Sequence, residues 1–285
     1  SLSVCPSQSA EFLSPVDVCL WLNVTCYRSE ITAILVDDNN LTGPLPAELA
    51  RLDKLEQIDL DGNNNIRGEI PSSLGSLKSL EVLDLDFNEI SGSLPETLYD
   101  AKYLSVLDLN DNKITGTLST RLGNLDKLRI LMLEANNITG TLPSEIGKLE
   151  KLRYLTLDNN ELEGTIPSTY GDIKELQYLT LHNNAGINGT IPTFVGDFRS
   201  LRVLSLFNTQ MSGTIPTQLG RLKGLETLFL HSANFSGTMP QEICNLRTAD
   251  DGADGKSLRR LTADCAGPNP KVVCPQPSCC SGCFS

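Results

Sequence analysis

The feature that most constrains this chain is a repeat that keeps its register from residue 31 to residue 248. Nine rows of 24 or 25 residues begin at Ile31, Leu55, Leu80, Leu104, Leu128, Leu152, Leu176, Leu201 and Leu225. A glycine stands in every row, from Gly43 to Gly237, and a proline follows three residues later in every row except the one that has Ser119. A register kept this long predicts that each row forms the same structural unit and that neighbouring units stack.

Each row reads L-x-x-L-x-L-x-x-N-x-L-x-G-x-I-P-x-x-L-x-x-L, which is the pattern of a leucine-rich repeat. The alternation in Leu83-Asp84-Leu85 has the period of a strand with one buried face. An asparagine then turns the chain inward, and a stacked column of such amides can satisfy the backbone groups of the turns. The column contains Asn39, Asn63, Asn88, Asn112, Asn136, Asn160 and Asn184. It stops at Thr209 and Ala233, which predicts that the last coils depend more on apolar packing.

One coil cannot bury its own apolar edge, whereas stacked coils share a continuous core. The sequence therefore predicts an α/β leucine-rich repeat solenoid, a curved right-handed superhelix with one parallel sheet on its concave face and short helical or extended returns on its convex side. We expect an N-terminal cysteine cap over residues 1–30, nine repeats over residues 31–248, and a partial tenth repeat with a cysteine-rich cap over residues 249–285. The tenth strand is expected at Leu258, Leu261 and Ala263.

Two kinds of segment carry a more specific resemblance. Leu41-Thr42-Gly43-Pro44-Leu45-Pro46 and Met211-Ser212-Gly213-Thr214-Ile215-Pro216 resemble the L-[ST]-G-x-[IL]-P signature of plant-type leucine-rich repeat proteins. That group includes receptor-kinase ectodomains, receptor-like proteins and polygalacturonase-inhibiting proteins. Cys19 and Cys26, with Trp21 between them, look like the N-terminal cap of that family, which implies a Cys19–Cys26 disulfide. The tail that ends Cys279-Cys280-Ser281-Gly282-Cys283-Phe284 looks like the tails of secreted algal leucine-rich repeat proteins.

The cysteines lie only at the two ends of the chain, as expected when disulfides hold terminal caps in an oxidising compartment. Cys244, Cys265, Cys274, Cys279, Cys280 and Cys283 are expected to pair with one another in an order that the sequence leaves open, and Cys5 is the expected odd thiol. No apolar run has the roughly 18–20 residues that a bilayer requires, and Ser1 begins the chain without a signal-peptide core. We expect a processed product that is secreted or lies at the extracellular face of the cell surface.

In each row, the residues that flank the paired leucines point out of the sheet, about 4.8 Å from their counterparts in the next coil. Early rows place carboxylates there: Asp37, Asp59, Asp61, Asp84, Asp86, Asp108, Glu134 and Asp158. One interpretation is a surface that attracts a cationic ligand or Ca²⁺, and the other is that an exposed sheet must be polar somewhere. The net charge of −12 argues against nucleic acid as a partner.

Later rows place large rings on the same face: Tyr154, Tyr178, His182, Phe207, Phe229 and His231. Several large apolar residues on an open face favour a binding site. His182 and His231 lie two coils apart, about 10 Å by strand spacing, without a third ligand at a zinc spacing, so we expect neither a metal site nor a cofactor. The carboxylates lie on a shallow solvated sheet, which does not supply the raised-pKa acid of a glycosidase cleft. We therefore expect no enzymatic activity.

A second ladder runs along the turn in triplets such as Thr139-Gly140-Thr141 and Ser212-Gly213-Thr214. Rows of threonine could match ice or a polysaccharide, although the β propensity of threonine in a short second strand explains them more simply. Glycosylation sequons occur at Asn23, Asn40, Asn137, Asn188 and Asn234.

The combined expectation is an extracellular, receptor-ectodomain-like protein that binds a protein or peptide on its concave face, with cationic ligands among the expected partners. The alternatives are an inhibitor of a secreted cell-wall hydrolase and an ice- or polysaccharide-binding protein.

Overall fold

The computed structural model describes residues 19, 23–247, 258–268, 270–276 and 279–284. Its internal contacts divide the chain into two compact units, Ser1–Ile138 and Thr139–Ser285, and each is described by itself. The expected odd thiol, Cys5, lies outside the described residues. Among the described residues, no helix combines the length and the apolar character needed to cross a membrane.

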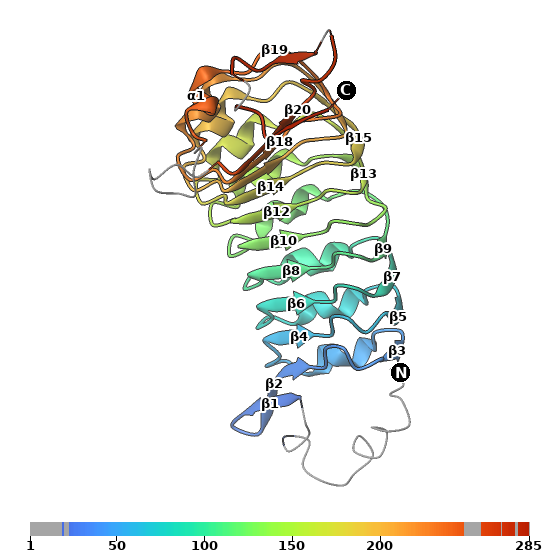
Figure 1. Cartoon of the computed structure of the whole chain (residues 1–285). Helices are drawn as coiled ribbons and strands as arrows, with labels where there is room; N and C mark the ends of the chain where they lie inside the picture. Colours follow the sequence, from blue (N-terminus) through green and yellow to red (C-terminus); the bar gives the residue numbers. More distant parts are fainter. Residues whose placement is uncertain (1–18, 20–22, 248–257, 269, 277–278, 285) are drawn as a thin grey trace. The chain divides into compact units, whose positions relative to one another are not determined.

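In the first unit, one strand from each row joins a main sheet in the order β1-β2-β4-β6-β8-β10 (Figure 1). β1 pairs antiparallel with β2, and the strands from β2 to β10 are parallel. A shorter sheet, β3-β5-β7-β9, follows the turns. The strands are β1 (Val24–Tyr27), β2 (Glu30–Leu35), β3 (Thr42–Gly43), β4 (Gln57–Asp59), β5 (Asn65–Gly68), β6 (Val82–Asp84), β7 (Glu89–Gly92), β8 (Val106–Asp108), β9 (Lys113–Ile114) and β10 (Ile130–Met132).

The second unit repeats this arrangement, with a parallel main sheet in the order β12-β14-β16-β18-β20-β22 and a short sheet in the order β11-β13-β15-β17-β19-β21. The expected tenth strand is β20. The strands are β11 (Thr139–Thr141), β12 (Tyr154–Thr156), β13 (Glu161–Gly164), β14 (Tyr178–Thr180), β15 (Asn184–Gly189), β16 (Val203–Ser205), β17 (Thr209–Thr214), β18 (Thr227–Phe229), β19 (Asn234–Thr238), β20 (Arg260–Ala263), β21 (Val272–Val273) and β22 (Gly282–Cys283).

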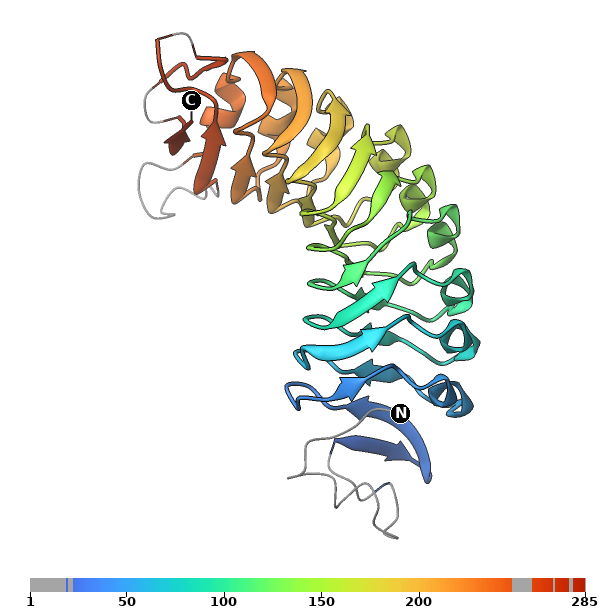
Figure 2. The same ribbon diagram turned by 90° about the vertical axis from the view of Figure 1, so that its right-hand side faces the viewer.

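The return segments are one-turn 3-10 helices that line one side of each unit (Figure 2). A proline in extended conformation precedes each of them except η5, where Ser119 accepts a hydrogen bond from the N–H of Arg121 instead. The helices are η2 (Ala47–Arg51), η3 (Ser72–Ser76), η4 (Glu96–Asp100), η5 (Thr120–Asn124), η6 (Ser144–Lys148), η7 (Ser168–Asp172), η8 (Thr193–Asp197), η9 (Thr217–Arg221) and the α-helical turn α1 (Gln241–Cys244). These elements confirm the expected leucine-rich repeat solenoid with parallel strands and short returns.

The core of each unit lies between the main sheet and the return helices. Leucines at equivalent positions, such as Leu83 and Leu107, are fully buried and pair across adjacent strands. The return segments add larger side chains, among them Tyr99 in η4 and Phe198 directly after η8. Each buried leucine contributes roughly 1.5–3 kcal/mol, so the repeated apolar positions drive the stacking.

The asparagine column is present inside the turns and bonds coil to coil. Asn112 shows the pattern: its Nδ2 donates to the carbonyls of Leu85, in the preceding row, at 2.9 Å and Asn110 at 3.0 Å, while its Oδ1 accepts the N–H of Ile90 at 2.8 Å. Asn88 and Asn136 repeat these contacts one row earlier and one row later. The side chain thereby satisfies buried backbone groups that the turn leaves without partners.

Where the asparagine column stops, other polar groups take its place, so the expectation that the last coils depend more on apolar packing needs correction. Thr209 donates its hydroxyl to the carbonyl of Leu206 at 2.8 Å. At Ala233, the carboxylate of buried Asp264 accepts the N–H groups of Ser232 at 2.6 Å and of Ala233 itself at 3.3 Å. The turn therefore still requires a polar side chain, which here comes from the tail.

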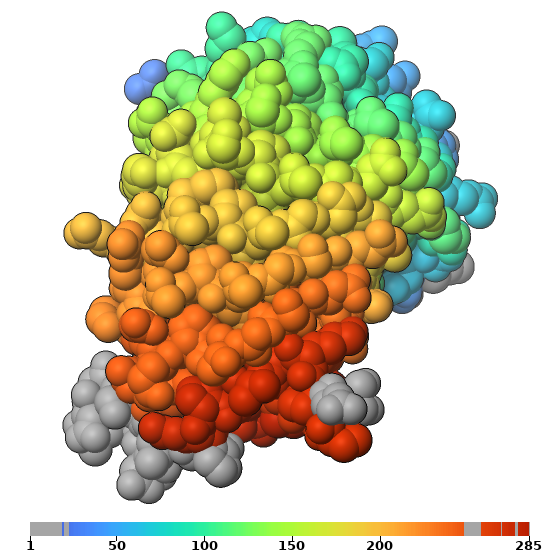
Figure 3. All heavy atoms as spheres, turned by 90° about the horizontal axis from the view of Figure 1, so that it is seen from above, coloured from blue at the N-terminus to red at the C-terminus, as the bar shows by residue number. Residues whose placement is uncertain are grey.

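Disulfides tie both ends. Cys19 and Cys26, whose pairing the family resemblance implies, are bonded. The six C-terminal cysteines pair as Cys244–Cys279, Cys265–Cys283 and Cys274–Cys280. In the view from above, the C-terminal side chains lie directly beside the coils that precede them (Figure 3).

We expect Asn112→Ala to lower the free energy of unfolding by about 2–4 kcal/mol, because it leaves several buried backbone groups without partners. Exposed Asn137 in the following turn provides the control, since Asn137→Ala should change stability by less than about 0.5 kcal/mol. Urea unfolding followed by circular dichroism measures both. Equal losses in the two variants would contradict the role of the buried column.

Candidate functional site

The solvent face of the main sheet carries two different sets of side chains. The first unit holds seven of the eight expected carboxylates, here called the acidic group: Asp37, Asp59, Asp61, Asp84, Asp86, Asp108 and Glu134. The second unit holds all six expected rings and Asp158.

The centre of the acidic group is a row of carboxylates on adjacent strands. Asp59, Asp84 and Asp108 are direct partners across β4, β6 and β8. Burial and, to a smaller extent, neighbouring negative charges raise the pKa of Asp84 to about 6, that of Asp86 to about 7 and that of Asp108 to about 8. Burial and the charge of Asp59 also raise the pKa of Asp61. At neutral pH the centre of the group therefore carries less negative charge than the sequence indicates.

Three members of this group could hold part of a cation site. Carboxylate oxygens of Asp84, Asp86 and Asp108 lie within 4.8 Å of one another. The Oδ1 atoms of Asp86 and Asn110 are buried and accept no hydrogen bond. Ca²⁺ requires 6–8 oxygen ligands, so these residues would supply only part of its shell. Asp37 is fully exposed at the margin, and Glu134 accepts a hydrogen bond from Asn110 at 3.2 Å.

Sequence reasoning missed an exposed ring beside the acidic group. Phe87 follows Asp86, is 50% exposed, and has a φ of 46°. A bulky side chain is unusual in this left-handed conformation. Equivalent positions in other rows hold residues such as Asp111, Asn159 and Asn183, so the departure from that pattern could have revealed it.

In the second unit, four rings form a continuous column, here called the ring stack: His182, Phe207, His231 and Phe284. The centroid separations of successive rings are 4.2, 4.6 and 4.1 Å, and the angles between ring planes are 23°, 9° and 18°. Phe229 meets Phe207 and His231 edge to face, both at 6.2 Å. Tyr154 and Tyr178 stack on each other at 4.5 Å.

A polar layer fixes the two imidazoles of the stack. Nε2 of His182 lies 3.2 Å from Oδ2 of Asp158, and its Nδ1 lies 3.1 Å from the hydroxyl of Ser205. Nδ1 of His231 lies 2.7 Å from the hydroxyl of Thr262. Burial lowers the pKa of both histidines. The charge of Asp158 opposes this shift at His182, and that of Asp264 opposes it at His231. Because burial is the larger effect, both rings are neutral at pH 7.

Asp158 differs from the other expected carboxylates, because it is 7% exposed and bonded on both oxygens. Thr180 donates to its Oδ1, and His182 lies at its Oδ2. Asp158 therefore orients a ring instead of presenting free charge. Phe284, the fourth ring, was missed because it lies outside the repeat register, where no row has an equivalent.

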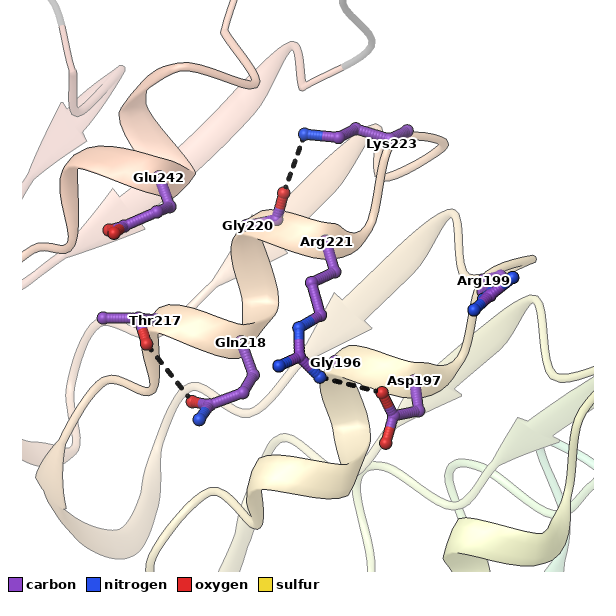
Figure 4. A pocket seen from close by; sticks show the side chains of 9 residues that line it. All are labelled: Gly196, Asp197, Arg199, Thr217, Gln218, Gly220, Arg221, Lys223 and Glu242. Carbon is purple, nitrogen blue, oxygen red and sulfur yellow. Dashed lines mark hydrogen bonds and ion pairs between the residues drawn. The ribbon is translucent and has the colours of Figure 1, made fainter.

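Two further features lie away from the main sheet. In an open hollow between η8, η9 and α1, Arg221 contacts Asp197 at 3.1 Å and Lys223 donates to the carbonyl of Gly220 (Figure 4). The sequons at Asn40, Asn137, Asn188 and Asn234 are exposed, and that at Asn23 is half-buried.

We expect Asp108→Asn to stabilise the chain at pH 8–9 by about 1–3 kcal/mol, because it removes a charge that burial disfavours. The pKa of Asp108 is raised to about 8 in the folded chain, so its stabilising effect is complete below the ordinary value of about 4 and is lost as the pH rises through 8. The wild type should therefore lose more stability than the variant between pH 6 and pH 9. Thermal unfolding across this range tests the difference, with Asp53→Asn as an exposed control.

Solved structures similar to this chain include ectodomains of plant receptor kinases. The ectodomain of the Arabidopsis thaliana receptor kinase GASSHO1/SCHENGEN3, in complex with CASPARIAN STRIP INTEGRITY FACTOR 2, shares 32% identity over 91% of this chain and 29% of its own length, with a TM-score of 0.80. The Arabidopsis receptor kinase HAESA, in complex with the peptide hormone IDA and the co-receptor SERK1, shares 30% identity over 93% of this chain and 43% of its own length. Its TM-score is also 0.80. A plant ice-binding protein shares 25% identity over 94% of this chain and 93% of its own length, with a TM-score of 0.69. The chain thus spans less than half of either receptor structure.

Among curated protein sequences, none matches significantly. Family models match directly: a leucine-rich repeat region matches residues 91–248, and single leucine-rich repeats match residues 54–77 and 79–101. These models describe repeats and name no catalytic activity. Together with the parallel sheet and the receptor-ectodomain neighbours, they show that this chain belongs to the leucine-rich repeat family and is of the plant type.

Proposed function

We propose that this chain is an extracellular recognition protein that binds a peptide or protein on the solvent face of its main sheet. The ring stack is the observation that carries the proposal. A soluble chain gains little from a column of large rings on an open face unless a partner covers it. Aromatic anchors held in fixed positions lose little conformational entropy on binding.

The receptor neighbours support the proposal, since GASSHO1/SCHENGEN3 is in complex with CASPARIAN STRIP INTEGRITY FACTOR 2 and HAESA with the peptide hormone IDA and the co-receptor SERK1. The disulfides at both ends support an extracellular location. Tyr154, Tyr178, His182, Phe207, Phe229 and His231 are proposed to anchor the partner. The exposed members of the acidic group, such as Asp37, are proposed to attract positively charged partners and to speed their encounter.

A second function is favoured by a column of exposed threonines at or just after the ends of β11, β13, β15, β17 and β19: Thr141, Thr165, Thr190, Thr214 and Thr238. Glycines keep this column in place, because a Cβ added to Gly213 would lie 2.9 Å from Cγ2 of Thr190. The similarity to a plant ice-binding protein makes ice adsorption the second candidate. The sequons at Asn188 and Asn234 lie on the same short sheet, and glycans there would cover it.

We expect Phe207→Ala combined with Phe229→Ala to speed partner dissociation by about 10–100-fold, because it removes two anchoring rings. The probe is a peptide selected on the wild type from a library of random linear peptides, and surface plasmon resonance gives the rates. Tyr103→Ala is the matched control, since it removes an exposed ring that lies after η4 and outside the main sheet. Unchanged lifetimes in the double variant would refute the anchor role.

For ice adsorption, we expect the wild type to show no thermal hysteresis, because the anchoring rings and not the threonines are proposed to bind. The measurement is the gap between melting and freezing points of a single ice crystal. Hysteresis that Thr190→Tyr abolishes and Tyr103→Ala preserves would assign the threonine column to ice binding instead.

A further inference from the structure

The last ring of the stack comes from the tail, not from a repeat. Phe284, which directly follows β22, packs on His231 with a centroid separation of 4.1 Å, although β22 is separated from β18 by β20. The ring therefore reaches across β20 to the repeat beyond it. Phe284 is 42% exposed, so it closes one end of the stack while remaining accessible.

Short backbone pairings hold the segment around this ring, among them the N–H of Ser281, which is donated to the carbonyl of Leu261 at 2.8 Å. β22 has only two residues, and it pairs with Thr262 and Ala263 of β20. Phe284 donates its N–H to the carbonyl of Ala263 at 3.0 Å, and its own carbonyl accepts the N–H of Ala266 at 3.1 Å. Hydrogen bonds at an exposed edge compete with water, so they constrain a chain end only weakly.

The nearest covalent constraint is the Cys265–Cys283 disulfide, which lies one residue before Phe284. The disulfides of the tail differ in accessibility. Cys283 is exposed and Cys265 is half-buried, whereas Cys244 and Cys279, which pair with each other, are only 8% and 2% exposed. A reductant in solution should therefore reach the bond beside Phe284 before it reaches the buried one.

We propose that the Cys265–Cys283 disulfide is a redox-sensitive tether that holds Phe284 on His231. The tether makes Phe284, the fourth ring of the ring stack, part of the binding surface and makes partner binding dependent on oxidation of the tail. The binding part of this proposal rests on the proposed function, whereas the tether does not. A dithiol reductant opens the bond by donating two electrons and two protons. The products are the thiols of Cys265 and Cys283 and the cyclic disulfide of the reductant.

A third sulfur decides how the tether must be tested. Sγ of Cys274, which is bonded to Cys280, lies within 4.8 Å of the sulfurs of both Cys265 and Cys283. If only one partner of the tether were replaced, the remaining thiolate could attack the Cys274–Cys280 bond and form a new disulfide, releasing the other sulfur. The informative variant is therefore Cys265→Ser combined with Cys283→Ser.

The tether is tested without any ligand by NMR titration of the His231 ring. Phe284→Ala and the double serine variant should both raise the pKa of His231 toward its ordinary value, because the ring that buries it is removed or released. The pKa of His182, at the far end of the ring stack, should change little. Cys274→Ser combined with Cys280→Ser is the control that removes a neighbouring disulfide and keeps the tether.

Partial reduction of the wild type with dithiothreitol provides a second test that does not depend on the folding of a variant. Mass spectrometry identifies the opened bonds, and we expect Cys265–Cys283 to open before Cys244–Cys279. Opening of Cys265–Cys283 should raise the pKa of His231, as in the variants. If the pKa of His231 stayed the same after the Cys265–Cys283 bond had opened, the tether proposal would be overturned.

The binding arm uses the library-selected peptide as its probe. Phe284→Ala and the double serine variant should each speed its dissociation by about 5–20-fold, and the control disulfide variant should not. If Phe207→Ala with Phe229→Ala weakens binding but Phe284→Ala does not, the fourth-ring assignment is wrong and the proposed function stands. If none of these variants changes the dissociation rate of the peptide, or if no peptide is selected, the proposed function and the binding role of Phe284 both fail. The NMR titration alone then decides whether the tether exists.

Discussion

Both units depend on one constraint: a chain that turns sharply inward in every row must satisfy buried backbone groups at each turn. The asparagine column does this by donating to carbonyls of its own and the preceding row while accepting an N–H from the preceding row. Because each amide bonds two rows, it also fixes how the rows stack. Where asparagine is absent, the hydroxyl of Thr209 and the carboxylate of Asp264 meet the same need, which shows that the requirement belongs to the turn and not to one residue type.

This stacking places outward side chains of adjacent strands next to one another, and the consequence depends on their chemistry. Burial raises the pKa of Asp108 to about 8, with a further contribution from the carboxylates held close to it, so these groups do not all ionise at neutral pH. Aromatic rings at the same strand spacing stack favourably, as the separations of 4.1–4.6 Å in the ring stack show. The same repeat therefore places mutually repelling carboxylates on the surface of the first unit and favourably stacked rings on the surface of the second.

The tail combines stability and recognition in a short segment. Asp264 completes the inward turn at Ala233, while Phe284 completes the outward stack at His231. The Cys265–Cys283 disulfide joins the neighbourhoods of these two residues. A change in this bond would therefore affect the core of the last coils and the proposed binding surface together.

The sequence by itself determined the repeat period, the parallel strands, the asparagine column and the side chains that face outward, because each follows from a periodic register that local geometry repeats. It also indicated that rings such as Phe207 and His231 would be neighbours. Only the tertiary structure decided that Asp158 bonds His182, that Phe284 joins the stack and which cysteines pair. Those contacts depend on side-chain reach, burial and the path of a tail that follows no repeat, so no period in the sequence encodes them.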